Sequence, residues 1–238
     1  MDAAYFETRV SKVALFESLG RGILKYQEML MIYELRTYTL IAGAEEEFTK
    51  RIAERQPARE RYSPMAAYWR VDVGPLNEVV HVWPYSDAMH REKVRASLGM
   101  DEDLRRLPPR RDLVLTQRSE LMTPTSFMRP MGSKDFGSGN IYVMRIDTYA
   151  PGALPDVLTA WSAALPAREV LSPLVACWTN DVGDLNRLVH VWVYKDHAQR
   201  SNVLAEVRER GVWPPKTSSR PMKQESKVLL PAAFSPLR

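Results

Sequence analysis

The tetrapeptide Val-His-Val-Trp occurs at residues 80–83 and again at 189–192, and this repeat decides the fold. The shift of 109 residues that superposes the two tetrapeptides also aligns 32–91 with 141–200 without a gap. Of those 60 aligned pairs, 26 are identical. Self-similarity of this extent is typical of a duplicated structural unit. Most of the 238 residues therefore belong to two tandem copies of one unit.

The repeat divides the chain into four parts. We expect the first copy at 32–122 and the second at 141–238, joined at 123–140 by a Pro-, Gly- and Ser-rich linker. Residues 1–31 match neither copy, and we interpret them as an N-terminal extension. The acidic and basic residues there balance, and that composition fits neither a secretory nor a mitochondrial leader. A natural start at Met31 is the second interpretation.

Each copy alternates strand-like and helix-like segments. Aromatic and β-branched runs predict the strands, and acids or caps predict where the helices begin. In the first copy we expect the strands Ile32–Leu40, Met65–Val73, Glu78–Tyr85 and Leu113–Met122 and the helices Ala44–Gln56 and Asp87–Leu98. The second copy repeats this order and ends in a strand at Ser226–Leu230. The order βαββαβ is that of a ferredoxin-like unit, whose sheet leaves one face uncovered. We therefore predict an α+β fold in which two ferredoxin-like repeats pack sheet to sheet as a pseudo-dimeric α+β barrel.

Composition and charge exclude several functional classes. The single cysteine, Cys177, rules out a disulfide framework and is typical of a cytoplasmic protein. No apolar run is long enough to span a membrane, and the four histidines lack the spacing of a metal site. We therefore predict no metal and no cofactor. The one dense basic cluster, Arg105, Arg106, Arg110 and Arg111, is surrounded by acids. We interpret it as a solvated helix end and loop, and we expect no nucleic-acid binding.

Several short motifs occur in the same order in both copies. In the first copy they are Ile32–Tyr38, Gly74–Asn77, His81–Tyr85 and Arg91. Together they resemble the NIPSNAP family; in the second copy Asp184 replaces the turn proline and Val193 replaces Pro84. The resemblance implies the dimeric α+β barrel superfamily, whose members include cofactor-free monooxygenases, isomerases and haem enzymes. It supplies no agreed catalytic residues. Sheet edges in such barrels favour further association, so we expect a homo-oligomer.

Strand alternation places the polar and aromatic side chains on one face of the sheets. Since Val80 and Val82 suit packing against helices, we expect the opposite face to line the interior between the two sheets. The candidate ligand-binding residues there are Arg36, Arg145, Trp83, Tyr85, Trp192 and Tyr194, and the candidate acid–base residues are His81 and His190. The simpler interpretation is structural: aromatic core residues, hydrogen-bonded histidines and ion-paired arginines.

Two functions from different classes remain open on this evidence. The leading hypothesis is a pocket between the sheets that binds a small apolar or aromatic ligand with a carboxylate or carbonyl group, with a cofactor-free oxygenase or isomerase as its enzymatic form. The alternative is a non-enzymatic scaffold protein whose barrel is filled by its own side chains. A packed interior without a cavity would favour the scaffold.

Overall fold

The computed structural model describes residues 31–180 and 182–238, so the predicted N-terminal extension lies, except for Met31, outside the described residues. The first copy contains β1 (Ile32–Leu40), α2 (Glu45–Glu60), β2 (Ala67–Val73), β3 (Glu78–Tyr85), α3 (Ala88–Met100), α4 (Glu102–Arg106), the 3-10 helix η1 (Arg111–Leu113) and β4 (Val114–Pro124). The second copy contains β5 (Ile141–Thr148), α5 (Leu154–Glu169), β6 (Leu174–Asn180), β7 (Arg187–Tyr194), α6 (His197–Glu209) and β8 (Lys223–Pro231). The predicted βαββαβ order is confirmed, and α4 and η1 are additions to it.

The first helix of each copy is longer than the sequence predicts. We expected Pro57 to end the helix, because proline lacks the backbone donor and crowds the preceding turn. Instead α2 continues through Pro57 to Glu60. The turn beyond the proline is held by Arg59, which donates to the Ser63 carbonyl and the Tyr85 hydroxyl. The final turn thus positions a side chain that contacts the sheet.

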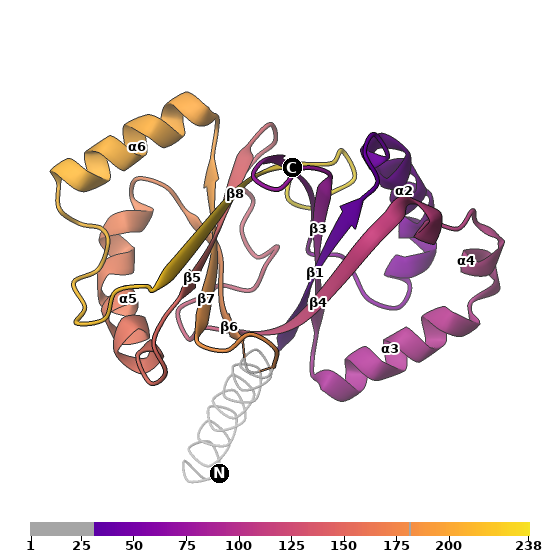
Figure 1. The fold of residues 1–238 in the computed structure, drawn as a ribbon, viewed down its shortest axis with the longest axis horizontal. Coiled ribbons are helices and arrows are strands. Elements are labelled where there is room, and N and C mark those ends of the chain that lie inside the picture. Colours follow the sequence, from indigo (N-terminus) through magenta and orange to yellow (C-terminus); the bar gives the residue numbers. More distant parts are fainter. Residues whose placement is uncertain (1–30, 181) are drawn as a thin grey trace, which may run out of the picture.

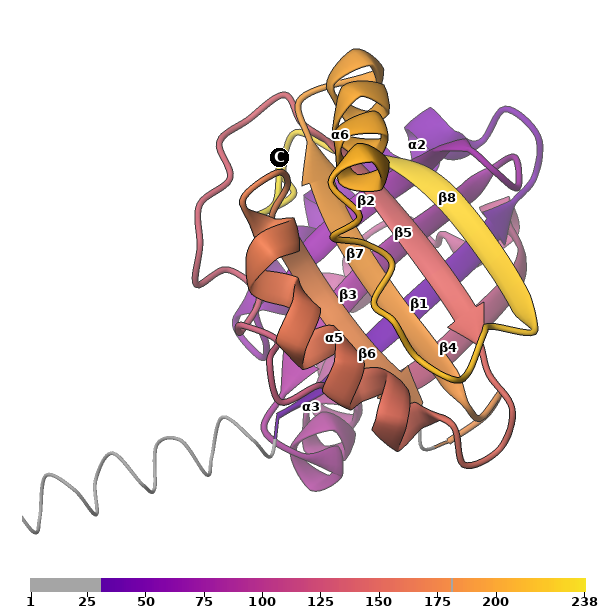
Figure 2. The ribbon, with the colours of Figure 1, turned by 90° about the vertical axis from the view of Figure 1, so that its left-hand side faces the viewer.

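Eight antiparallel strands close into one barrel. Each copy forms a four-stranded sheet, in the orders β4-β1-β3-β2 and β8-β5-β7-β6. The edge strands then pair between copies, β2 with β8 and β4 with β6. Figures 1 and 2 show the helices on the outside, with α2, α3 and α4 covering one sheet and α5 and α6 covering the other. The predicted fold is confirmed, and the two sheets are joined by hydrogen bonds along both seams.

The barrel interior is filled by apolar side chains from both copies. Its buried core includes Tyr33, Leu35, Trp69, Val80, Val82, Tyr142, Met144, Trp178, Val189 and Val191. This reverses the predicted orientation of the sheets, because Val80 and Val82 point inward while His81 and Trp83 face the helices. An eight-stranded barrel is just wide enough for side chains to fill it or for one small ligand, and here the side chains of both copies fill it. Charged groups such as Arg36 would be buried there without water, so they lie on the outer face.

The segment predicted as a linker is packed onto the barrel. Met128, Met131 and Phe136 contact the interior core, and the Met131 backbone N–H donates to the Tyr33 hydroxyl at 3.3 Å. Arg129 pairs with Glu169 at 2.5 Å. The two copies are therefore connected by a stretch that forms part of the packed structure.

Each seam carries one buried ion pair between the copies. Glu78 on β3 pairs with Lys227 on β8, and Arg187 on β7 pairs with Glu120 on β4 at 2.5 Å. Glu78 and Arg187 are equivalent positions of the repeat, and the strand registers make Glu120 and Lys227 equivalent as well. The first copy thus supplies both acids and the second copy both bases. Pairing two first copies would oppose acid with acid, so the charges favour the association of unlike copies.

Candidate functional site

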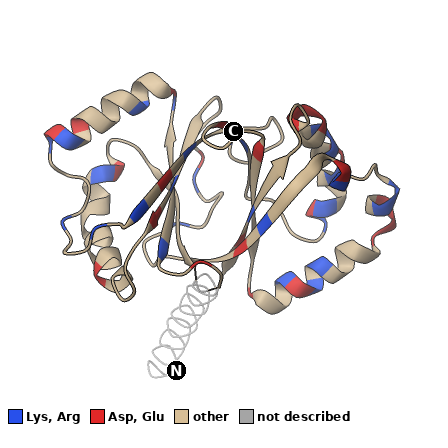
Figure 3. Cartoon of the chain, in the orientation of Figure 1, with Lys and Arg blue, Asp and Glu red and all other residues tan. Residues whose placement is uncertain are grey.

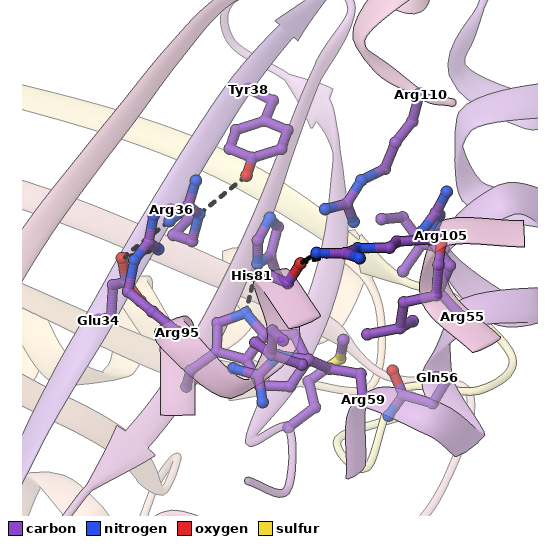
Figure 4. A pocket seen from close by; sticks show the side chains of 16 residues that line it. Glu34, Arg36, Tyr38, Arg55, Gln56, Arg59, His81, Arg95, Arg105 and Arg110 are labelled. Carbon is purple, nitrogen blue, oxygen red and sulfur yellow. Dashed lines mark hydrogen bonds and ion pairs between the residues drawn. The ribbon is translucent and has the colours of Figure 1, made fainter. Parts of the chain in front are cut away.

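A cavity of about 400 Å³ lies outside the barrel, between the first sheet and its helices. Its floor comes from β1 and β3, and its walls come from α2, the end of α3, α4 and the loop before η1 (Figure 4). The apolar part of the lining consists of Ile52, Met65, Trp83, Leu98 and Leu104. The charged part consists of Arg36, Arg55, Arg59, Arg95, Arg105, Arg110 and Glu34. Six arginines around one glutamate make the cavity strongly electropositive.

Strand alternation explains why these side chains meet. On β1 the polar side chains of Glu34 and Arg36 alternate with Tyr33 and Leu35, which fill the barrel. On β3, His81 and Trp83 alternate in the same way with the inward valines. Since β1 pairs with β3, with Arg36 opposite His81, the polar residues form one patch on the outer face.

Glu34 is the buried anion of the site. It is 1% exposed and pairs with Arg36 at 2.8 Å, Arg91 at 2.6 Å and Arg95 at 3.2 Å. Ser119 also donates to it, at 2.6 Å. Burial alone would raise the pKa of this carboxyl, but the hydrogen bonds and the guanidinium charges outweigh burial and lower the pKa to about 2. Glu34 is therefore ionised, and its charge is already matched.

The other arginines have no acidic partner. Within the described residues, no carboxylate lies within 4.0 Å of Arg55, Arg59 or Arg110. Arg55 donates instead to the carbonyls of Leu104, Leu107 and Pro108, which pins the loop leading to Arg110. Arg59 stacks on the Trp83 ring at 4.0 Å. Burial, followed by the nearby Arg55, Arg36 and Arg59, lowers the pKa of Arg110. Neutral groups therefore accept the hydrogen bonds that Arg55 and Arg59 donate.

His81 is neutral and presents a free hydrogen-bond donor. The Trp83 indole N–H donates to His81 Nδ1 at 2.6 Å, so Nδ1 carries no proton and the neutral ring is protonated on Nε2. Burial, aided by Arg36 and Arg110, lowers the pKa of His81 well below its ordinary value. The side chain is 4% exposed, and Nε2 has no hydrogen-bond partner among the described residues.

Of the eleven buried side-chain polar atoms that lack a hydrogen-bond partner in the described residues, three belong to residues that line this cavity. Besides His81 Nε2, the buried atoms Arg55 Nε and Gln56 Oε1 lack partners in the described part of the chain, and both residues line the same space. Buried polar atoms are normally paired with protein or with a bound molecule. A ligand with several acceptor atoms would satisfy the two donors.

The equivalent space in the second copy is filled. Trp161 stands where the first copy has Ile52, and its ring lies 4.7 Å from His190 and 4.5 Å from Trp213. His190 Nε2 lies 3.3 Å from Asp147, at the position equivalent to Tyr38. Burial lowers the pKa of His190, although Asp147 opposes the shift. The duplication has therefore produced one open site and one closed site.

The structure separates the residues that the sequence placed in one pocket. Arg36, His81 and Trp83 line the cavity, while Tyr85 lies behind it as a partner of Arg59 and Glu34. The second-copy candidates are distributed around the closed site: Arg145 near Asp147, and His190, Trp192 and Tyr194 buried under the helices. None of these residues faces the barrel interior, because that space is filled by the valines and their neighbours.

Of the six arginines that line the cavity, the sequence predicted only Arg36 as a binding residue. Arg55 and Arg59 come from α2, and Arg105 and Arg110 belong to the basic cluster that we interpreted as solvated. That interpretation is wrong for Arg110, which is half-buried and lines the cavity, whereas Arg105 also lines the cavity but stays exposed. Arg106 of the same cluster does point outward, paired with Glu102 on the surface. The available signal was the Pro-Ala-Arg-Glu repeat, which places Arg59 and Arg168 over equivalent tryptophans.

Two further features limit the chemistry. No three His, Cys, Asp or Glu side chains come together as a possible metal site in residues 31–180 and 182–238. Of the helices described, none is long and apolar enough to cross a membrane. Elsewhere on the molecule, acidic and basic residues are intermixed along the helices (Figure 3).

A family profile, a protein sequence and a solved structure to which this chain is similar all carry the same family name. The NIPSNAP sequence profile matches residues 33–129 and 142–236. The human protein NipSnap homolog 3A is 26% identical over 223 residues, covering 87% of this chain and 86% of the relative. A NIPSNAP domain protein from Burkholderia xenovorans, described as uncharacterized, is 32% identical over 42% of this chain and 99% of its own, with a TM-score of 0.40. A putative monooxygenase from Lactobacillus acidophilus is 10% identical, covers 84% of this chain and 93% of its own, and has a TM-score of 0.57.

Proposed function

Since this chain belongs to the NIPSNAP family and its first copy holds an open, arginine-lined cavity between sheet and helices, we propose that it binds a small organic anion there. The ligand has an apolar body that lies against Ile52 and Trp83 and an anionic group that lies near Arg110. The observation that carries the proposal is the set of guanidiniums without a carboxylate partner, together with unpaired buried donors on the same cavity.

The expected contacts follow from the chemistry of the lining. Arginine suits oxyanions because its planar fork offers several donors, and these charge-assisted hydrogen bonds are stronger than neutral ones. His81 supplies Nε2–H as a neutral donor to a second oxygen of the ligand. An apolar wall with a few convergent polar groups is the usual character of a small-molecule site. We therefore place the working space of the protein under the helices of the first copy.

The scaffold alternative is favoured by one observation. The barrel interior is packed with side chains, which is the feature that this alternative requires. It offers no account of the uncompensated arginines or of the unpaired His81 Nε2 outside the barrel. If none of the anionic probes binds, the scaffold function becomes the better supported of the two.

The proposal is tested by calorimetric titration of the full chain. The probes are 1-naphthoate, 1-naphthyl phosphate and the uncharged 1-naphthol, at pH 7.5. We expect at least one anion to bind and 1-naphthol to bind more weakly. Arg110→Ala should weaken anion binding by about tenfold or more, because it removes a charged donor from the cavity.

The matched control is Arg106→Ala, which removes the same charge from an exposed position on α4. It should leave the affinity unchanged. If neither anion binds, or if Arg106→Ala weakens binding as much as Arg110→Ala does, the proposal is wrong.

A further inference from the structure

The two equivalent histidines differ in the partner of Nε2: His190 has one, and His81 has none among the described residues. At His190 the protein supplies its own oxyanion, because Asp147 accepts from the imidazole Nε2–H at 3.3 Å. At His81 the equivalent position is Tyr38, whose hydroxyl accepts from Arg36 Nε at 2.9 Å and leaves His81 Nε2 free. The repeat thus contains an internal example of an oxyanion on this imidazole. In the first copy no described residue supplies that oxyanion.

The charge around this position exceeds what one negative charge would match. Glu34 is already engaged by Arg36, Arg91 and Arg95. Arg55, Arg59 and Arg110 remain without a carboxylate partner among the residues described, and the Arg110 guanidinium makes no hydrogen bond to them. The second copy has a smaller excess, since Ala164 stands at the position equivalent to Arg55, although Arg168, equivalent to Arg59, is also buried without an ion pair among the described residues. A monocarboxylate would leave most of this positive charge unmatched.

The free donors also favour a compact head group with several oxygens. They are the Arg110 guanidinium, Arg55 Nε and His81 Nε2–H, all on the lining of one cavity (Figure 4). A phosphate monoester presents three terminal oxygens and a charge near −2 at neutral pH. A carboxylate presents two oxygens and a single charge.

From this arrangement we propose that the natural ligand is a phosphate monoester with an apolar body, and that its phosphate lies beside Arg110, Arg55 and His81. This inference rests on the proposed function, since it names the class of anion that the same cavity takes. The apolar body lies toward Trp83, Met65 and Leu98.

The experiment compares 1-naphthyl phosphate with 1-naphthoate, which share one ring system and differ in charge. Titration of the full chain at pH 7.5 should give an affinity for the phosphate at least about tenfold higher than for the carboxylate. Lowering the pH to 5.5 should weaken phosphate binding several-fold, because the second phosphate pKa is about 6. Binding of 1-naphthoate should change little over this range, since Glu34 stays ionised and His81 stays neutral.

The outcomes separate the two proposals. If 1-naphthoate binds as tightly as 1-naphthyl phosphate, or if phosphate binding does not respond to pH, the phosphate inference is wrong while anion binding stands. If neither compound binds, the proposed function itself fails. An Arg55→Met variant, which keeps the length and the apolar stem, should reduce the preference for the phosphate more than the affinity for the carboxylate.

Discussion

Replacing Glu34 by glutamine is expected to lower the free energy of unfolding by about 3 kcal/mol at pH 7, because the change leaves Arg36, Arg91 and Arg95 without their shared carboxylate. The pKa of Glu34, which the same contacts lower, gives a similar magnitude. A shift from 4.5 to about 2 corresponds to about 3 kcal/mol of linked stability. The lowered pKa means that this stability is present above about pH 4.5 and is lost as the pH falls toward 2.

Urea unfolding of the wild type and Glu34→Gln at pH 7 and pH 3 tests this prediction. The difference between the two proteins should shrink at pH 3, because the Glu34 carboxyl of the unfolded chain, with its ordinary pKa of 4.5, is then protonated and folding has to release that proton. The control is Glu102→Gln, on a carboxylate that is 77% exposed and pairs with Arg106 on the surface. We expect this change to lower the free energy of unfolding by about 0.5 kcal/mol or less. A Glu34→Gln effect below about 1 kcal/mol at pH 7 would show that the buried cluster does not stabilise the fold as argued.

Replacing Arg187 by glutamate is expected to destabilise the chain by at least about 3 kcal/mol. The substitution opposes two carboxylates at one seam of the barrel, where Arg187 and Glu120 have side chains 5% and 9% exposed. The physical reason is the segregation of charge between the copies, with acids in the first and bases in the second. The melting temperature should fall accordingly, and adding Glu120→Arg should restore much of it.

A double-mutant cycle separates the pairing from the cost of burying each group. The surface control is Arg210→Glu, because Arg210 is 55% exposed at the C-terminal end of α6. If the double variant is no more stable than Arg187→Glu alone, charge pairing across the seam does not determine how the copies associate.

The fold could be predicted from the sequence because each strand and helix occurs in two copies, and the two patterns could be compared. Residues 32–40 and 141–148 form the first strand of each copy, as the shared pattern predicts. The orientation of the sheets could not be obtained in the same way. Both faces of β3 are apolar or aromatic, and burial is nearly complete on both. Alternation then identifies two faces without saying which one lies inside the barrel.

The site was only partly predictable for a related reason. Arg36 on β1 and His81 and Trp83 on β3 lie on one face of the sheet, so the alternation of side chains along each strand predicts that they lie together. Arg55 and Arg110 reach the same cavity from a helix and from a loop, and their meeting depends on the tertiary packing that Arg55 itself helps to hold. A basic loop surrounded by acids is usually a solvated one. Only the described structure distinguishes Arg110 from its outward neighbours.

We propose that the ligand binds in the open cavity of the first copy and not in the barrel interior. Ile52→Trp tests it most directly, because the second copy already holds an indole at this position, beside His190 and Trp192. The fold should accept the change with little loss of melting temperature, and Ile52→Val should bind as the wild type does. Titration of the Ile52→Trp variant with 1-naphthyl phosphate should show affinity reduced at least about tenfold, because the indole fills the space. Wild-type affinity in a folded Ile52→Trp protein would contradict the account.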